Sequence, residues 1–511
     1  MTPLQKHRLK YLPPLPDLLK NLDRITFKGK GETTALDHEK EIEKLFPKTY
    51  GRPLLLPAKG DPALSKALKV GVVLSGGQAA GGHNVITGLF DALKKLHPES
   101  HLIGFLNGPS GIIEGNTLDL SEDLLANYRN QGGFDLIGSG RTKIETEEQL
   151  EKSVAVLNRL QLDALVIIGG DDSNTNAAIL AETCLAKGCK TKIIGVPKTI
   201  DGDLQAPHLD ISFGFHTATA TYSEMIGNIA RDALSAKKYT HIIKLMGRSA
   251  SHIALECALN THPNLTLIGE EVAAKQMTLK QVTSHIADLI EKRGNAGKNY
   301  GVILLPEGLI ECILEIKHLI KSPEAAFDFL PKEIAEQLLL DRDPHGNIQV
   351  SHIQTELLLS KTVQEELKNR PSFKGKFNPV HHFFGYEGRS ALPTNFDATY
   401  CYALGMVSAL LIREGHTGYM SSIQHLTKPP AEWEICGIPI TSLMNIETRK
   451  GKEKPVIRKA LVDLNGHPFK TFERNRSKWA IDDHYAYPGP IQFDGDPEIT
   501  NQVPSILSIL Q

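Results

Sequence analysis

The stretch KVGVVLSGGQAAGGHN, residues 69–84, decides the fold class of this chain. Its first seven residues form an apolar run rich in valine, which is typical of a strand buried on both faces. The glycine-rich segment that follows predicts a tight turn, and a helix is expected from there to about Leu96. Strand, glycine turn and helix in this order predict one βα unit of a parallel sheet.

Similar apolar runs recur along the chain and are separated by stretches that predict helices, near 175–187, 216–235 and 279–293. The further strands are expected at residues 101–107, 163–169, 191–197, 240–247, 265–271 and 300–308. This alternation predicts an α/β fold with parallel sheets. Ligands of such sheets bind at the carboxyl ends of the strands, and the polar motifs of this chain fall there.

The length of 511 residues suggests about three domains. Two α/β domains are expected, with a helical insertion and extra segments at both ends. The predicted division is an N-terminal extension at 1–68, a first α/β domain at 69–235, a second at 236–310 and 376–430, a helical insertion at 311–375 and a C-terminal segment at 431–511.

Charge and cysteine usage exclude several classes of protein. The net charge is only −2, from 57 Lys and Arg against 59 Asp and Glu, so no broad surface for nucleic acid or an anionic membrane is expected. The basic run RKGKEK (449–454) is interpreted as a solvated loop rather than a nucleic-acid patch. Six cysteines without a C-x-x-C pair favour reduced thiols in a cytoplasmic enzyme. Neither a secretory signal nor a run of about 20 apolar residues is seen.

Two polar motifs follow predicted strands and carry groups suited to phosphate chemistry. Gly76 and Gly77 in SGGQAAGGHN allow backbone N–H groups to approach an anion, although a purely structural turn is the alternative. Asp171 and Asp172 in GGDDS end an apolar strand. Adjacent carboxylates beside a phosphate loop suit Mg²⁺, which needs only one or two of them. The alternative is a solvated turn without a ligand.

A third motif, PKTIDGD (197–203), places a lysine, a threonine and two carboxylates just after a strand. One carboxylate can accept a proton from a hydroxyl nucleophile, and Lys198 can meet a phosphate as a point charge. Arg248 and the pair Tyr386 and Arg389 suit a sugar phosphate, and Arg141 is a weaker candidate. Surface salt bridges are the alternative for either Arg248 or Arg389 taken alone.

The motifs SGGQAAGGHN, GGDDS, PKTIDGD, KKY, MGRSASH, PEG and YEGR, in this order over about 69–410, resemble those of the phosphofructokinase family. The resemblance is strongest to the long pyrophosphate-dependent fructose 6-phosphate 1-phosphotransferases, near the plant-type catalytic subunit. It implies two Rossmann-like parallel-sheet domains, the first for the phosphoryl donor and the second for the sugar phosphate. The implied reaction is reversible phosphoryl transfer from pyrophosphate to the 1-hydroxyl of fructose 6-phosphate.

The resemblance also implies a role for each motif. Asp201 would be the proton acceptor, Asp171 the Mg²⁺ ligand, Asp172 and Lys198 the residues that select the donor, and Gly76 and Gly77 the pyrophosphate loop. Lys238 and Tyr239 would reach the site of a neighbouring subunit, so a homodimer or larger homo-oligomer is expected. The implied sugar-phosphate site comprises Thr199, Ile200, Asp201, Met246, Gly247, Arg248, Glu307, Tyr386, Glu387, Gly388 and Arg389.

Three other functions remain as alternatives. An ATP-dependent phosphofructokinase is disfavoured because such enzymes usually have glycine where Asp172 stands. A non-catalytic regulatory subunit of a mixed oligomer is disfavoured because Asp171, Lys198 and Asp201 are all present. An NAD kinase shares a similar G-G-D motif, but the segments MGR and YEGR do not fit it.

Overall fold

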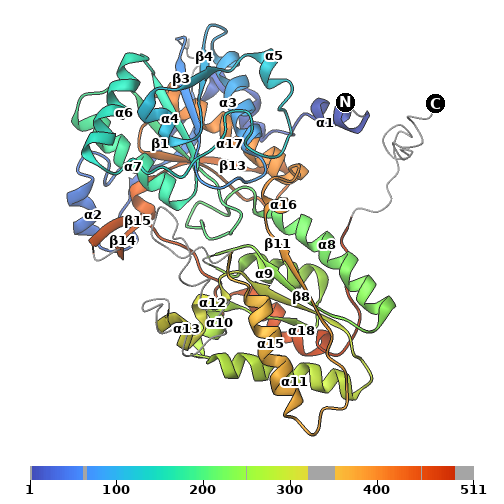
Figure 1. The fold of residues 1–511 in the computed structure, drawn as a ribbon. Helices are drawn as coiled ribbons and strands as arrows, with labels where there is room; N and C mark the ends of the chain where they lie inside the picture. Colours follow the sequence, from blue (N-terminus) through green and yellow to red (C-terminus); the bar gives the residue numbers. More distant parts are fainter. Residues whose placement is uncertain (1–2, 61–65, 249, 320–351, 450–451, 490–511) are drawn as a thin grey trace.

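The computed structural model describes residues 3–60, 66–248, 250–319, 352–449 and 452–489, and it has two lobes, each built around one sheet (Figure 1). The strands of the first sheet lie in the order β1 (Ile25–Glu32), β2 (Pro53–Lys59), β13 (Glu434–Pro439), β12 (Tyr419–Gln424), β7 (Lys192–Pro197), β6 (Ala164–Gly169), β3 (Lys69–Leu74), β4 (His101–Phe105) and β5 (Thr117–Asp119). Those of the second lie in the order β11 (Pro379–Phe384), β8 (Thr240–Leu245), β10 (Gly301–Pro306) and β9 (Leu265–Thr266).

The five central strands of the first sheet, β12, β7, β6, β3 and β4, are parallel, as their apolar runs predict. Alternate residues of β3 pack on opposite faces: Val70 and Val72 join one apolar cluster and Val73 joins another. Helices α3 (Gly82–Leu96) and α17 (Asn395–Arg413) cover the first face. The other face is covered by α4 (Pro109–Glu114), α6 (Glu147–Arg159) and α7 (Asp171–Ala186).

Helices α3 and α17 approach each other so closely that only glycine fits at their crossing. A Cβ atom on Gly88 would lie 2.0 Å from the carbonyl oxygen of Tyr402. One on Gly405 would lie 2.2 Å from the carbonyl oxygen of Val85. This packing fixes α17, a late segment of the chain, against the first βα unit.

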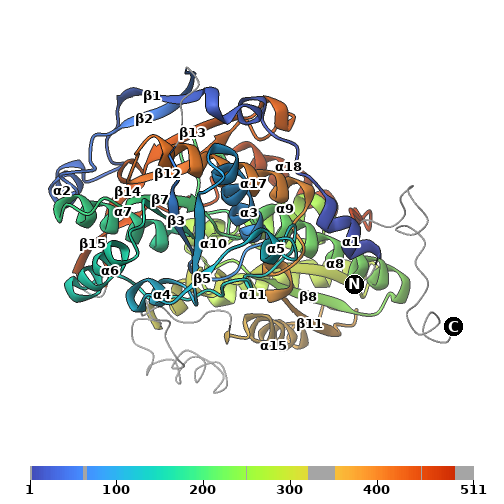
Figure 2. The ribbon, with the colours of Figure 1, turned by 90° about the horizontal axis from the view of Figure 1, so that it is seen from above.

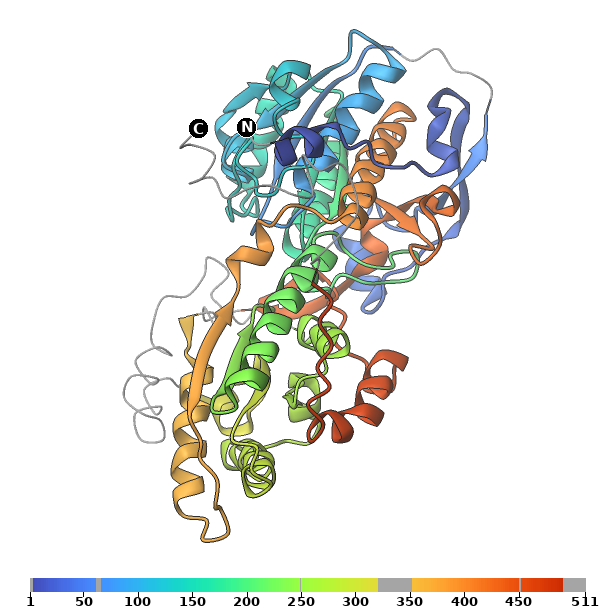
Figure 3. The ribbon, with the colours of Figure 1, turned by 90° about the vertical axis from the view of Figure 1, so that its right-hand side faces the viewer.

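The second sheet is parallel throughout and is also covered on both faces. Helices α8 (Phe215–Ala236) and α9 (His252–Thr261) pack on one face, and α11 (Leu279–Asn295) and α15 (Thr355–Lys368) pack on the other. The long helix α8 runs from the first lobe into the second (Figure 3). Its N-terminus is held by the buried Asp397 of α17, whose carboxylate accepts from the N–H groups of Gly214 (3.1 Å) and Thr217 (2.8 Å).

The sheets divide the chain differently from the expected domains. The stretch 376–430 was expected in the second α/β domain, but only β11 joins that sheet, and β12 returns to pair with β7 of the first. The N-terminal hairpin β1–β2 also extends the first sheet, through β13, at the edge seen at the top of Figure 2. Strand pairing over such distances leaves no local mark in the sequence, which is why the boundary was placed wrongly.

Smaller expectations also changed. The predicted strand at 265–271 is only β9, and a helix, α10 (Gly269–Ala274), follows it. The stretch 449–454 contributes to the hairpin β14 (Met444–Arg449) and β15 (Lys452–Ile457), with residues 450–451 outside the described part. In the predicted insertion the described part contains helices α13 (Leu314–Leu319) and α15 and a non-helical stretch at 369–375, whereas 320–351 lie outside the described residues.

Among the described residues, no helix is both long enough and apolar enough to cross a membrane.

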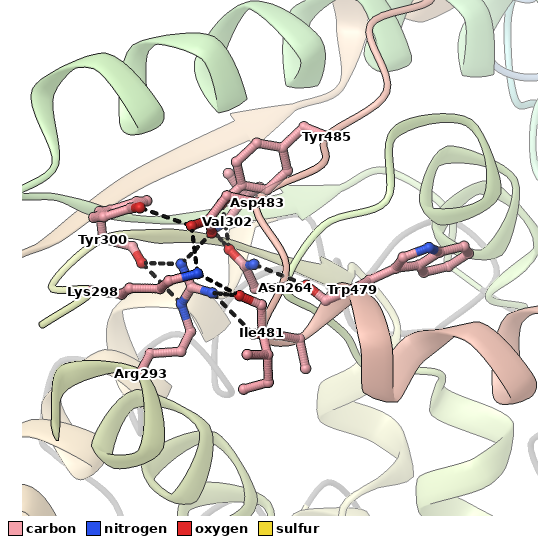
Figure 4. A network of polar contacts seen from close by, with 10 residues as sticks. Asn264, Arg293, Lys298, Tyr300, Val302, Trp479, Ile481, Asp483 and Tyr485 are labelled. Atoms are coloured by element: carbon pink, nitrogen blue, oxygen red, sulfur yellow. Dashed lines mark hydrogen bonds and ion pairs between the residues drawn. The ribbon is translucent and has the colours of Figure 1, made fainter. Parts of the chain in front are cut away.

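The C-terminal segment is fastened to the second lobe by a buried charge network (Figure 4). After helix α18 (His467–Trp479) the chain turns and runs beside α8 (Figure 3). Arg293 of α11 is almost fully buried, donates to the carbonyl oxygen of Tyr300 and pairs with Asp483 at 2.7 Å. Lys298 pairs with Asp483 from the partly exposed side, at 2.9 Å.

We expect Arg293→Met to destabilise the protein by about 3–5 kcal/mol, because it leaves the Asp483 carboxylate buried beside fewer cations. Lys298→Met is the matched control and should cost less than about 1 kcal/mol, since its ammonium is partly solvated. Urea unfolding followed by tryptophan fluorescence measures both. Equal, small losses in the two variants would show that the network does not hold the C-terminal segment in place.

Candidate active site

One cleft lies where strands of both sheets end. Residues after β3, β6 and β7 of the first sheet face residues after β8, β10 and β11 of the second. The cleft brings together most of the residues expected from the motifs: Gly76, Gly77, Asp171, Asp172, Lys198, Thr199, Asp201, Met246, Arg248, Glu307, Tyr386 and Arg389.

The glycines after β3 allow two cations to lie against the backbone. Gly76 has a φ of +86°, a conformation that side chains disfavour. A Cβ atom on Gly77 would lie 2.7 Å from an Nη atom of Arg389. The ammonium of Lys198 donates to the carbonyl oxygen of Gly77 at 2.5 Å. This loop is therefore lined by positive charge, which suits an anion.

Lys198 is nearly fully buried, and burial lowers its pKa to about 7. The nearby Arg389 contributes to this lowering of the pKa, whereas the carboxylate of Asp201 opposes it. An anion entering the cleft would stabilise the protonated form of this lysine. The side chain is thus arranged to gain from a phosphate ligand.

Acidic side chains lie on the same side of the cleft, each near a lysine. Asp171 and Asp172 occupy the first turn of α7, where carboxylates interact favourably with the helix dipole. Lys143 lies 3.6 Å from Asp172, and Lys459 lies 3.6 Å from Asp171 and 3.5 Å from Asp203. Burial, together with the charge of Asp201, raises the pKa of Asp203 to about 7, although Lys459 opposes the shift.

Asp201 carries the most conspicuous unsatisfied group in the cleft. Its backbone N–H donates to the hydroxyl of Thr199 at 3.1 Å, which fixes the turn after β7. Its side-chain Oδ1 is buried and has no hydrogen-bond partner among the described protein groups. A buried oxygen without a partner is costly, so this one is suited to accept a proton or hydrogen bond from a ligand.

The second lobe contributes a buried carboxylate and a bridging arginine. Glu307 follows β10 and accepts from the N–H of Gly247 at 2.9 Å, and burial raises its pKa. Arg389, in the short helix α16 (Tyr386–Arg389), has its Nε 2.8 Å from the sulfur of Met246. It also donates to the carbonyl oxygen of Gln78 at 3.2 Å, so it connects the sugar-phosphate candidates with the glycine-rich loop.

Some expected residues lie outside the lining. Ile200 is fully buried, and Gly388 packs against the ring of Tyr222. Lys238 and Tyr239 precede β8, at the opposite end of the strand from Met246. Gly247 and Glu387 are adjacent in sequence to lining residues but do not line the cleft themselves.

Other lining residues were missed or given little weight in the sequence. The loop with Arg141, Thr142 and Lys143 lines the cleft, and of these the sequence marks only Arg141 as a candidate. Lys459 comes from the C-terminal segment, and no motif marks it. Asp203 is the second carboxylate of PKTIDGD, and it also lines the cleft.

Comparison with known proteins identifies the family of this chain. The family model described as Phosphofructokinase matches residues 69–412. A pyrophosphate–fructose 6-phosphate 1-phosphotransferase of Treponema pallidum is 50% identical, over 98% of this chain and 96% of the relative. The beta subunit of the pyrophosphate–fructose 6-phosphate 1-phosphotransferase of Solanum tuberosum is 50% identical, over 96% of this chain and 91% of the subunit. The alpha subunit from the same organism is 41% identical, over 97% of this chain and 87% of that subunit.

Solved structures agree on the fold. The crystal structure of a pyrophosphate-dependent phosphofructokinase from Nitrosospira multiformis has a TM-score of 0.59 and 17% identity, and the match covers 86% of this chain and 98% of that one. The family match spans most of both lobes, and the relatives are similar over nearly their whole length. The chain therefore belongs to the phosphofructokinase family.

Proposed function

We propose that this protein transfers a phosphoryl group reversibly between pyrophosphate and the 1-hydroxyl of fructose 6-phosphate, giving fructose 1,6-bisphosphate and phosphate. The observation that carries the proposal is the 50% identity to enzymes of this name over nearly the full chain, together with Asp172 and Lys198 beside the glycine-rich loop. Phosphoryl transfer depends mainly on positioning and charge neutralisation, and the cleft offers both.

The pyrophosphate would lie on Gly76 and Gly77, next to the ammonium of Lys198. The sugar phosphate would lie towards the second lobe, where Arg248, Tyr386 and Arg389 can hold its 6-phosphate. Asp201 lines the same cleft and would accept the proton of the 1-hydroxyl as the new bond to phosphorus forms. Its unpartnered oxygen supports this role.

Magnesium fits the cleft as a ligand shared with the substrate. No cluster of three or more His, Cys, Asp or Glu side chains that could hold a metal occurs within the described residues. Mg²⁺ needs only one or two carboxylates when phosphate oxygens and waters complete its coordination. Asp171, with Asp203 nearby, would hold it, and an ammonium already lies between these carboxylates. When bound, the ion neutralises charge on the pyrophosphate.

The alternatives have weaker support. An ATP-dependent enzyme would need room and a tolerable charge where the Asp172 carboxylate stands. A non-catalytic regulatory subunit of a mixed assembly is the other alternative. It is disfavoured because Asp171, Lys198 and Asp201 all line this cleft. We also propose a cytoplasmic location, because all six cysteines are unpaired thiols.

We propose that the active unit is a homodimer or larger homo-oligomer with shared sites. Lys238 and Tyr239 precede β8, whose other end meets the cleft, and both are exposed, as contact with another subunit requires. The Solanum tuberosum relatives are named as alpha and beta subunits, which indicates a mixed assembly in that plant.

Asp201→Asn should lower kcat by about 10²–10⁴-fold, because it removes the proton acceptor while preserving size. Direct binding of fructose 6-phosphate, measured by calorimetry, should change little. The kcat is measured with purified protein, magnesium and saturating pyrophosphate. A kcat within a few-fold of wild type would contradict the role of Asp201.

Donor choice provides the test of the proposed function itself. Wild type should phosphorylate fructose 6-phosphate with pyrophosphate and not with ATP. Asp172→Gly should raise the ATP to pyrophosphate ratio of kcat/KM, because it removes both the bulk and the negative charge that oppose the α-phosphate of ATP. Adding Lys198→Gly should weaken pyrophosphate use further, and the two effects should not simply add, since both residues face one ligand.

Asp172→Asn is the matched control, since it keeps the size and removes only the charge. If the ATP to pyrophosphate ratio of kcat/KM in Asp172→Asn lies between those of wild type and Asp172→Gly, both the charge and the size of Asp172 contribute to the exclusion of ATP. Use of ATP by wild type, or an unchanged ratio in Asp172→Gly, would show that donor choice is made elsewhere.

Site sharing can be tested by complementation. Co-expression of Asp201→Asn with Lys238→Met should restore about a quarter of wild-type activity, because half of randomly mixed dimers carry one intact site of two. The control pair is Asp201→Asn with Arg248→Met, which leaves both sites defective if Arg248 acts in its own subunit. No rescue in confirmed mixed oligomers would show that each site is built within one chain.

A further inference from the structure

A short segment that begins at the last residue of β15 ties the two lobes together at the cleft. We call residues 457–462 the active-site strap. At its start, the N–H of Ile457 donates to the hydroxyl of Thr175 in α7, at 3.2 Å. At its end, the N–H of Val462 donates to the carboxylate of Glu270 in α10, at 3.0 Å. The strap is therefore fixed to the first lobe at one end and to the second lobe at the other.

The middle of the strap is fixed beside the catalytic turn after β7. The N–H of Ala460 donates to the carbonyl oxygen of Asp203 at 2.7 Å. The carbonyl oxygen of Ala460 lies 3.0 Å from Nε2 of His252 in α9. On the other side of Lys459, the N–H of Arg458 donates to the carbonyl oxygen of Leu443 at 2.9 Å. The backbone is therefore held on both sides of Lys459, which lines the cleft.

The Lys459 ammonium lies between two carboxylates. It is 3.6 Å from an oxygen of Asp171 and 3.5 Å from an oxygen of Asp203, and its side chain is only 23% exposed. Asp203 is buried and Asp171 is partly buried, so their mutual repulsion is poorly screened by water. A cation held between them removes that repulsion and keeps the two side chains close.

We propose that Lys459 is a positioning residue that holds Asp171 and Asp203 together in the substrate-free protein and competes with the divalent cation for these carboxylates. The proposal rests on the proposed function in so far as Asp171 is the magnesium ligand. When the metal enters with pyrophosphate, the ammonium gives up Asp171 and remains in the cleft as a cation close to the incoming phosphates.

Competition predicts opposite effects on metal binding and on turnover. Without the ammonium, the two carboxylates are uncompensated, so a divalent cation should bind the substrate-free protein more tightly. Turnover should fall, because the carboxylates are no longer held in place and one positive charge near the phosphates is lost. General damage to the site would instead weaken metal binding and turnover together.

The experiment measures Mn²⁺ binding to the substrate-free protein by electron paramagnetic resonance, for wild type, Lys459→Met, Lys459→Gln and Lys459→Arg. The Kd for Mn²⁺ should fall by about ten-fold or more in the Met and Gln variants, a change that corresponds to about 1.4 kcal/mol. Their kcat with pyrophosphate should fall by more than about ten-fold. Lys459→Arg should stay near wild type in both respects, because it keeps the charge.

Lys470→Met is the matched control, since Lys470 forms an exposed ion pair with Glu473 on α18. It should change neither the Kd for Mn²⁺ nor kcat. Unchanged or weaker Mn²⁺ binding in Lys459→Gln and Lys459→Met would overturn the proposal. The titration needs no turnover, so tighter binding in these variants would support the role of Lys459 even if wild type failed to use pyrophosphate.

Discussion

The burial of both faces of two parallel sheets is the constraint on which the site depends. Helices cover each sheet on both sides, so the strands are apolar along their length, and polar chemistry is confined to the ends of the strands. Here the carboxyl ends of β3, β6 and β7 face those of β8, β10 and β11 across one cleft. Glycines, carboxylates and cations that are far apart in the sequence therefore meet at one place.

The cleft balances charge within a poorly solvated space. Carboxylates of Asp171, Asp201 and Asp203 lie near the cations of Lys198 and Lys459, and burial makes each charge more strongly felt by the others. The lowered pKa of Lys198 and the raised pKa of Asp203 reflect the same cost of burial. The positive charge of a metal ion and the negative charge of an anionic substrate partly cancel. The two together can therefore bind in this cleft without changing its net charge greatly.

Much of this arrangement could be predicted from the sequence, because its causes are local. Apolar runs predicted the parallel strands, and motifs after them predicted that Gly76, Asp171 and Asp201 would meet. Lys459 could not be predicted in this way, because its place in the cleft depends on where a late segment of the chain crosses between the lobes. The return of β12 to the first sheet was missed for the same reason, since pairing with β7 is decided by tertiary packing.

The long-range fastening of the chain has a consequence for its synthesis. The guanidinium of Arg413 donates to the carbonyl oxygen of Leu22, 391 positions earlier, and Ile457 bonds Thr175 across 282 positions. A chain emerging from the ribosome therefore cannot complete the first sheet, or close the cleft with the active-site strap, until nearly all of it has been made. During translation the first βα units therefore have an exposed sheet edge. We expect the last steps of folding, in which late segments complete the first sheet and close the cleft, to be slow because they depend on contacts between distant parts of the chain.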